Sequence, residues 1–487
     1  MPKNTLAEQV VSNARVVPKN PWGFILMTVL FPFYAAAAQA EVATDNSNYF
    51  VPSRSYRTQP TSDLPRYVRT LSETGIESLK SIDWLDAGLD HRVRYEYRDL
   101  DFRRKPQQGI DEPVLLRTRA YLGIKNILDP FRFVAEFQDS RSYNSRYATD
   151  NRDVDEFDLI QLYGELYFKD ALGSRRPVSI RGGRMWLEYL DRRLIANNEF
   201  RNTTNNFQGV RIKLGQQTND WETDLLALQP IDRLKYDFDR PVEQEWFYGI
   251  INSWRRWSDI VTLQPYYLGY KHASHTKADN VNKLNLHNTG LRGYGVVGNT
   301  GVDYDGNIVY QFGRSNGNQQ TSALAYDVEL GYTLEETPWK PRFSAFYGYG
   351  SGDRNPTDQS NQTFNPLFGF NQPWSRNDYF SWDNVHAPKL RVEFAPLKDL
   401  RIDTGYNAYW LASDSAAWKR ANLQDKTGQS GSFLGHEFDI RFRYKINPRI
   451  ESEASYAYFT PGEMPRNLGK SQNSNFFYLQ MTFSAFK

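Results

Sequence analysis

Short stretches in which polar and apolar residues alternate recur from Asp86 to the C-terminus, and this period of two constrains the fold more than any other feature. Such alternation predicts β-strands with two chemically different faces. In residues 434–446, Phe438, Ile440 and Phe442 share one face, while acidic and basic residues share the other. Gly, Pro, Asn or Asp bound each stretch, which is typical of turns.

We expect about eighteen strands from this pattern. They are residues 88–98, 113–125, 131–139, 158–169, 177–187, 207–215, 220–229, 245–253, 260–271, 286–298, 302–313, 322–334, 341–350, 387–395, 401–412, 434–446, 449–459 and 475–486.

The connections between these strands alternate between long and short. Residues 99–112 are followed by the short connection 126–130, and later the very long 351–386 contrasts with the two residues 447–448. Outer-membrane barrels have tight periplasmic turns and longer extracellular loops, whereas alternation within strands also occurs in soluble sheets. The predicted fold class is therefore all-β, a single transmembrane antiparallel β-barrel of about 18 strands with short periplasmic turns and long extracellular loops.

Composition agrees with a barrel and excludes several other classes. A mean hydropathy of -0.67 is too polar for a bundle of membrane-spanning helices. The 59 basic and 57 acidic residues nearly balance, which argues against nucleic acid as a partner. The absence of cysteine excludes disulfides and thiolate metal sites. Aromatic residues make up 15% of the chain, enough for girdles at both membrane interfaces.

The N-terminal region has the features of an export signal. Basic residues precede an apolar run from Trp22 to Ala38, and Ala38 to Ala40 form a small-x-small cleavage site. A membrane anchor is the alternative, but Pro32 interrupts the run. We therefore expect a cleaved signal peptide (1–40), a polar periplasmic lead segment (41–86) and an outer-membrane barrel (87–487), with the mature protein in the cell outer membrane.

The face opposite the apolar residues of each strand must point into the lumen. This parity predicts a polar lumen of mixed charge. Its arginines could lower the barrier for an anionic chain by binding carboxylates, or they could pair with lumenal acids and brace the barrel. The pore-lining residues predicted from parity are Arg92, Arg94, Arg117, Arg119, Arg211, Lys213, Arg391, Arg401, Asp439, Arg441 and Arg443.

The sequence contains no recognisable catalytic constellation, so we expect no enzyme, no cofactor and no metal site. Only six histidines occur. His272 and His275 share an expected external loop, where solvated side chains are more common than a metal site. Asp303-x-Asp305-Gly306 resembles a fragment of a calcium loop, but the remaining ligands are missing and Asp-Gly is an ordinary hairpin turn.

Several motifs together resemble the alginate export family of outer-membrane β-barrels. The most distinctive is residues 181–213 (RGGRMWLEYLDRRLIANNEFRNTTNNFQGVRIK). The others are residues 65–67 (PRY), 86–99 (DAGLDHRVRYEYRD), 347–353 (YGYGSGD), 364–368 (FNPLF), 380–384 (FSWDN), 409–418 (YWLASDSAAW) and 433–439 (FLGHEFD). This resemblance implies that Arg184 and Arg193 also line the substrate path.

The sequence departs from the family pattern at two places. Met185 stands where many relatives have Gln. The turn at Asn447 and Pro448 is too short for the long plugging loop of the dedicated alginate exporter, so gating by such a loop is not expected.

The resemblance implies an outer-membrane channel for export of a polysaccharide, an anionic, alginate-like polyuronate. Two alternatives use the same barrel: a substrate-selective porin for uptake of small anions or sugars, and an adhesin acting through loops 140–157 and 351–386. The expected partners are outer-membrane lipid and lipopolysaccharide, a polysaccharide or small anionic solute, and periplasmic export partners.

Overall fold

The structure is a computed structural model that describes residues 64–104, 109–255, 258–273, 283–315, 319–355 and 357–486. The predicted signal peptide, the first part of the predicted lead segment and His275 lie outside these residues.

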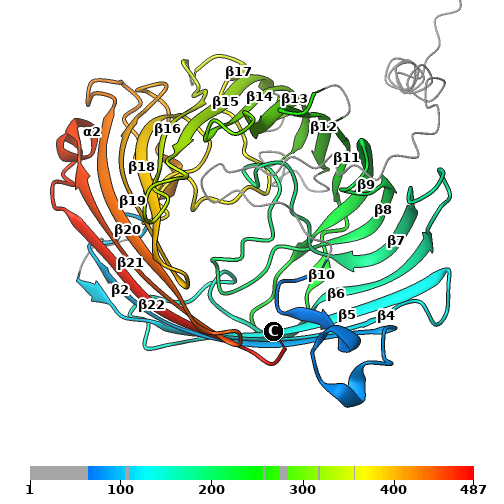
Figure 1. The fold of residues 1–487 in the computed structure, drawn as a ribbon. Coiled ribbons are helices and arrows are strands. Elements are labelled where there is room, and N and C mark those ends of the chain that lie inside the picture. Colours follow the sequence, from blue (N-terminus) through cyan, green and yellow to red (C-terminus); the bar gives the residue numbers. More distant parts are fainter. Residues whose placement is uncertain are drawn as a thin grey trace, which may run out of the picture. The chain divides into compact units, whose positions relative to one another are not determined.

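Within the described part of the chain, 22 strands form one sheet (Figure 1). Four have only two or three residues: β1 (Val68–Thr70), β3 (Ile110–Asp111), β10 (Arg240–Pro241) and β17 (Ser360–Asn361). The other eighteen have 8 to 15 residues, and each pairs antiparallel with its neighbours. Pairing of the first of them with the last, through Arg92 and Thr482 for example, closes the barrel.

The eighteen long strands coincide with the eighteen expected from sequence, which confirms the predicted fold class. They are β2 (Leu85–Asp99), β4 (Val114–Ile124), β5 (Phe131–Tyr143), β6 (Asp155–Phe168), β7 (Val178–Met185), β8 (Phe207–Gly215), β9 (Trp221–Asp232), β11 (Glu245–Trp254), β12 (Thr262–His272), β13 (Leu284–Val296), β14 (Val302–Ser315), β15 (Gln319–Thr333), β16 (Arg342–Gly350), β18 (Val385–Leu397), β19 (Leu400–Trp410), β20 (Phe433–Asn447), β21 (Ile450–Pro461) and β22 (Ser474–Ser484).

The connections keep the predicted alternation with one exception. Two residues separate β18 from β19 and β20 from β21, whereas residues 351–384 and 411–432 separate the strands at the opposite end. The exception is β14 and β15, which are separated by only residues 316–318 although both ends lie on the long-loop side. One prediction within this region was wrong: Asp303, Asp305 and Gly306 lie inside β14 and form no hairpin turn.

The two faces of the strands differ as the alternation predicts. On β18, Leu390 is 65% exposed, while Lys389 and Arg391 on either side of it are buried. Because buried charges need hydrogen-bonding partners, the charged face is the lumenal one and the exposed apolar face contacts lipid. Outward-facing aromatic residues such as Tyr97, Trp410 and Tyr458 gather toward the long-loop end of the strands, as expected for an interfacial girdle.

Part of the expected lead segment is ordered and joins the barrel. Strand β1 pairs with the start of β2, and Tyr67 and Val68 pack against Tyr121. The Tyr67 hydroxyl donates to Glu136 at 2.5 Å. The segment continues through two 3-10 helices, η1 (Leu71–Glu73) and η2 (Glu77–Leu79).

Helix is scarce elsewhere in the described residues. The loops contain η4 (Lys419–Ala421) and the five-residue α2 (Glu463–Asn467). No helix of the described part has the length and apolar character needed to cross a bilayer.

The largest apolar core lies inside the barrel. Loop residues Phe364, Trp374 and Trp382 are at most 1% exposed. The Phe380 ring stacks on Tyr409 with a centroid distance of 3.6 Å, and on Trp418 at 5.0 Å. Long loops therefore fold inward and pack within the lumen, as the loop traces inside the barrel show (Figure 1).

The assignment of the outer face can be tested with two leucines on one strand. Leu390→Lys, near the middle of β18, should destabilise the barrel in a bilayer by about 2–4 kcal/mol, because the charge enters the hydrocarbon core. Leu397→Lys, beside the short turn, should cost about 0–1 kcal/mol. Urea unfolding in phospholipid vesicles measures both, and equal effects of the two substitutions would contradict the assignment.

Candidate functional site: the lumen and its inward-folded loops

Two loops from opposite parts of the sequence meet inside the barrel. The loops are residues 186–206, between β7 and β8, and residues 351–384, between β16 and β18. The Phe368 amide donates to the Leu194 carbonyl at 3.0 Å, and the Ala196 amide donates to the Phe368 carbonyl at 3.2 Å. These hydrogen bonds join the loops into one structure across the lumen, which we call the loop bridge.

Four predicted arginines hold one side of the loop bridge to the barrel wall. Arg92 donates to the carbonyl oxygens of Glu199 and Arg201 at 2.9 and 2.8 Å. Arg117 and Arg119 bind the two carboxylate oxygens of Glu199 at 2.5 and 2.9 Å.

The fourth, Arg94, donates to the Phe200 carbonyl at 2.5 Å and lies 4.3 Å from the centre of the Phe200 ring. All four arginines are at least nine-tenths buried. Their hydrogen bonds are directed to the loop bridge and to neighbouring residues of the wall.

Glu199 is the acidic partner on which these arginines converge. Its side chain is 48% exposed, so it also faces the lumen. Partial desolvation of its carboxylate raises the pKa, but the positive charges of Arg117 and Arg119 outweigh this effect and hold the pKa below its usual range. Glu199 is therefore ionised at neutral pH and in mild acid.

A second cluster holds the other side of the loop bridge. Asp403 on β19 accepts hydrogen bonds from Arg391 (3.1 Å) and Arg441 (2.9 Å), and Arg443 reaches it at 3.4 Å. Arg376, from loop 351–384, binds the same carboxylate at 3.0 Å.

Asp439, which the sequence placed in the lumen, belongs to this second cluster. Its carboxylate accepts two hydrogen bonds of 3.0 Å from Arg391 and one of 3.4 Å from Arg376. The arginines of β2 and β4 and those of β20 therefore belong to two ion-pair networks, and each network fastens a loop.

Two residues predicted from family resemblance lie at the loops. Arg193 is in loop 186–206, pairs with Asp191 at 2.8 Å and lies over the ring of Phe346. Arg184, near the end of β7, pairs with Asp158 at 2.8 Å. Gly183 precedes it with φ of 137°, and a Cβ there would lie 2.3 Å from a backbone oxygen, so the local register requires glycine.

The remaining predicted residues lie nearer the short-turn end. Arg211 pairs with Asp224 at 2.7 Å, and Lys213 pairs with Glu222 at 3.3 Å. Arg401 is exposed and, among the described residues, forms no hydrogen bond or ion pair; it lies opposite Arg443 in the sheet register.

The short-turn end also contains a hollow of about 210 Å³ in the lumenal wall of β2 and β4 to β8. Its lining combines basic side chains with tyrosine rings, a combination suited to sugars that carry carboxylates. We call it the short-turn hollow. The residues that give it this character are Lys125, Arg132, Arg181, Lys213, Tyr121, Tyr163 and Tyr167, together with the acids Asp86 and Glu165.

Arg132 differs from the other cations of the short-turn hollow. Lys125 pairs with Asp86 at 2.7 Å, and Arg181 pairs with Glu165 at 2.9 Å. Arg132 lies 3.5 Å from the centre of the Tyr167 ring. Glu165 is opposite Arg132 in the sheet register, but Arg132 forms no ion pair among the described residues. Strand parity places Arg132 in the lumen, but nothing in the sequence distinguishes it from the other lumenal arginines.

Sequence analysis also missed the residues that fasten loop 351–384. Arg376 lies in this loop and pairs with Asp403 on the wall. Lys389 on β18 donates to the Pro373 and Trp374 carbonyls of the same loop. The loop has no periodicity from which these contacts could be predicted. The placement of His272 was also wrong: it ends β12, with its Nδ1 3.4 Å from Glu245.

Comparison with known proteins identifies related sequences and folds. The family model described as "Alginate export" matches residues 83–478. The fold resembles the crystal structure of Pseudomonas aeruginosa OpdQ, with 14% identity, coverage of 82% of this chain and 97% of that chain, and a TM-score of 0.56. It also resembles P. aeruginosa OpdK with vanillate, with 10% identity, coverage of 82% and 98%, and a TM-score of 0.57. A search of curated proteins finds no match.

The anchoring role of Glu199 predicts the effect of its removal. Glu199→Gln weakens the hydrogen bonds to Arg117 and Arg119, each worth about 1.5–3 kcal/mol when charged. We expect the ratio of open to closed channel to rise by about tenfold, as 1.4 kcal/mol would produce. Single-channel recording in a planar bilayer measures this ratio. The control is Glu336→Gln, an exposed residue in the turn between β15 and β16; an unchanged ratio for the Glu199 variant would contradict anchoring.

Proposed function

The chain belongs to the alginate export family, and from this premise we propose that it exports an anionic, alginate-like polyuronate that enters at the short-turn end of the barrel. It is an outer-membrane channel, and its family and fold are those of transport proteins. Its partners therefore include membrane lipid and the transported solute. The observation that carries the proposed substrate is the short-turn hollow, in which Arg132 has no acidic partner among the described residues.

The charge of the short-turn end supports an anionic substrate. Arg132 and the exposed Arg401 have no described acidic partner, and the Arg443 side chain is 30% exposed. A guanidinium group binds a carboxylate through two parallel hydrogen bonds, which a neutral sugar cannot match. Several weak sites of this kind attract a polyanion and still allow it to leave.

The loop bridge supports a gated path. It is fastened by ion pairs on both sides and packs around aromatic residues at the long-loop end. A polymer that enters from the short turns must displace at least one loop. A uronate carboxylate can replace the carboxylate of Glu199 or Asp403 as the partner of the arginines that bind them, because both are carboxylate groups.

We propose two further partners on family membership. Periplasmic export proteins would deliver the polymer to the short turns, and lipopolysaccharide would surround the aromatic girdle at the long-loop end.

Block of the ionic current tests the proposed substrate. Oligouronates added on the short-turn side should block the channel at low salt, with relief at high salt, because exposed charge contacts are screened. Arg132→Gln should weaken the block by about tenfold, the equivalent of 1.4 kcal/mol. The matched control is Arg354→Gln, an exposed loop residue, which should leave the block unchanged. Equal block by neutral oligosaccharides would contradict the proposal.

The exposed Arg401 and the partly exposed Arg443 at the short-turn end should set ion selectivity. Replacing Arg401 and Arg443 together with Ser removes two positive charges that lie opposite each other in the sheet register. We expect the reversal potential in a salt gradient to shift toward cation preference. An unchanged reversal potential would exclude these two residues from the filter.

Uptake of small anions or sugars is the second candidate function. The observation that favours it is the size of the short-turn hollow, because about 210 Å³ is smaller than the usual pocket for a drug-sized ligand. Saturable passage of monosaccharides in liposome swelling, without block by longer oligouronates, would favour this candidate over export.

A further inference from the structure

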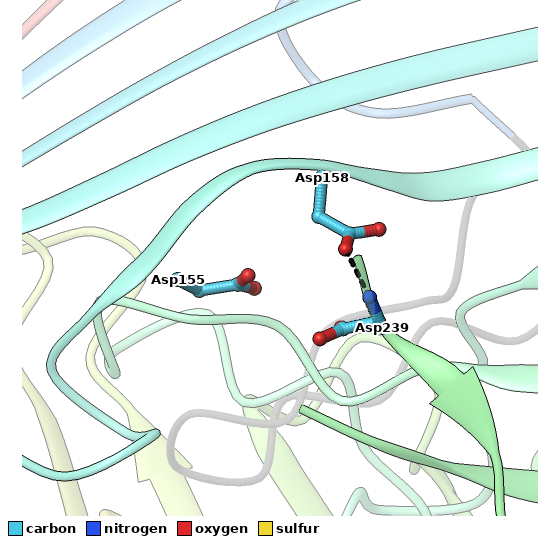
Figure 2. A group of neighbouring side chains, drawn as sticks. All are labelled: Asp155, Asp158 and Asp239. Carbon is cyan, nitrogen blue, oxygen red and sulfur yellow. Dashed lines mark hydrogen bonds between the residues drawn. The ribbon is translucent and has the colours of Figure 1, made fainter. Parts of the chain in front are cut away.

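Three aspartates from two parts of the chain lie close together (Figure 2). The elements that carry them place this cluster at the long-loop end of the strands. Asp155 and Asp158 lie at the start of β6, and Asp239 lies in the connection between β9 and β11. All three are buried, and one carboxylate oxygen from each lies within 4.8 Å of the others.

Part of this aspartate cluster lacks hydrogen-bond donors. Asp158 pairs with Arg184 at 2.8 Å and accepts the backbone amide of Asp239, while Asp239 Oδ1 accepts the amide of Leu234 at 2.7 Å. Neither oxygen of Asp155 has a partner among the described residues, and neither has Asp239 Oδ2. Asp155 is 0% exposed and Asp239 is 5% exposed. Figure 2 shows these two carboxylates turned toward each other.

The nearby cations do not supply the missing partners. Arg184 directs its other hydrogen bonds to the carbonyls of Leu159 and Asp239. Arg233 donates to the Asn205 side-chain oxygen and the Thr204 carbonyl. Three carboxylates therefore face two guanidinium groups that are mostly engaged elsewhere. Buried carboxylates without donors are costly, so this arrangement calls for an additional positive charge.

We infer that Asp155, Asp158 and Asp239 bind a divalent cation of the calcium type. Calcium takes oxygen ligands at about 2.3–2.6 Å, so two of its ligands can be as much as about 4.8 Å apart. Magnesium, with ligands at about 2.0–2.1 Å, requires a tighter set. Three carboxylates supply only part of a calcium shell, and waters or backbone carbonyls complete it.

A proton is the competing ligand for the same oxygens. A protonated carboxylic acid is a poor ligand, so calcium affinity should fall as the pH decreases.

The cation would stabilise the loop bridge through contacts separate from the two arginine clusters. Arg233 follows directly from β9 and binds Asn205 of loop 186–206, and Asn151 donates to the Arg233 carbonyl at 3.2 Å. Thr203 in turn donates to the Asn151 carbonyl at 2.9 Å. Binding at the aspartate cluster would thus stabilise three connected loops, whichever solute the channel carries.

Calorimetric titration of the refolded mature protein in detergent with calcium chloride tests the inference. At pH 8 we expect one saturable site, weaker binding of magnesium, and a higher thermal unfolding midpoint with calcium. Asp155→Asn and Asp239→Asn should each abolish binding and the shift. Asp237→Asn, an exposed aspartate two residues before Asp239, should retain both.

Two results would overturn the site. Calcium binding that persists in both Asn variants would place the cation elsewhere. No binding to the wild type at pH 8, with a higher unfolding midpoint for Asp155→Asn, would show that the cluster holds a proton instead. Neither result depends on the exported substrate, because current block by oligouronates is measured separately.

Discussion

A barrel wall that faces lipid on one side and the lumen on the other must place its charges inward, and each buried charge then needs a partner. In this protein many of those partners belong to loops. Arg117 and Arg119 bind Glu199 of loop 186–206, and Arg376 of loop 351–384 binds Asp403 on the wall. The requirement to pair lumenal charge therefore determines where these loops are fastened to the wall.

This arrangement divides the lumen into two chemically different parts. The long-loop half is filled by the loop bridge and its aromatic core, including the stacked rings of Phe380 and Tyr409. The short-turn half contains a hollow where Arg132 rests on a tyrosine without an acidic partner among the described residues. A polyanion that enters from the short turns would first meet the exposed arginines there and then the loop bridge, which ion pairs hold to the wall. Binding of carboxylates by arginine would therefore both attract the polymer and release the loop bridge.

The barrel could be predicted from sequence because its rules are local. The alternation within β20 is enough to place Phe438 on the outer face and Asp439 on the inner face, whichever strands lie beside it. The loops could not be predicted, because the contact between Ile195 and Phe368 joins segments without periodicity across much of the chain. Parity placed Arg92 in the lumen, but its carbonyl partners lie more than a hundred residues away. The aspartate cluster was missed for the same reason: Asp158 and Asp239 are 81 residues apart.

The central claim is that loop 186–206, held to the wall, closes the channel, and a reversible disulfide tests it most directly. Ile195 of this loop and Phe368 of loop 351–384 are bridge partners, and paired extended segments lie about 4.7–4.9 Å apart, within the Cα separation that a disulfide spans. The chain contains no native cysteine to interfere. In an Ile195→Cys, Phe368→Cys variant, the measurement is single-channel current before and after reduction. The account predicts that oxidation abolishes openings and that reduction restores them. Equal openings in both states would show that the current does not pass through the region this loop closes.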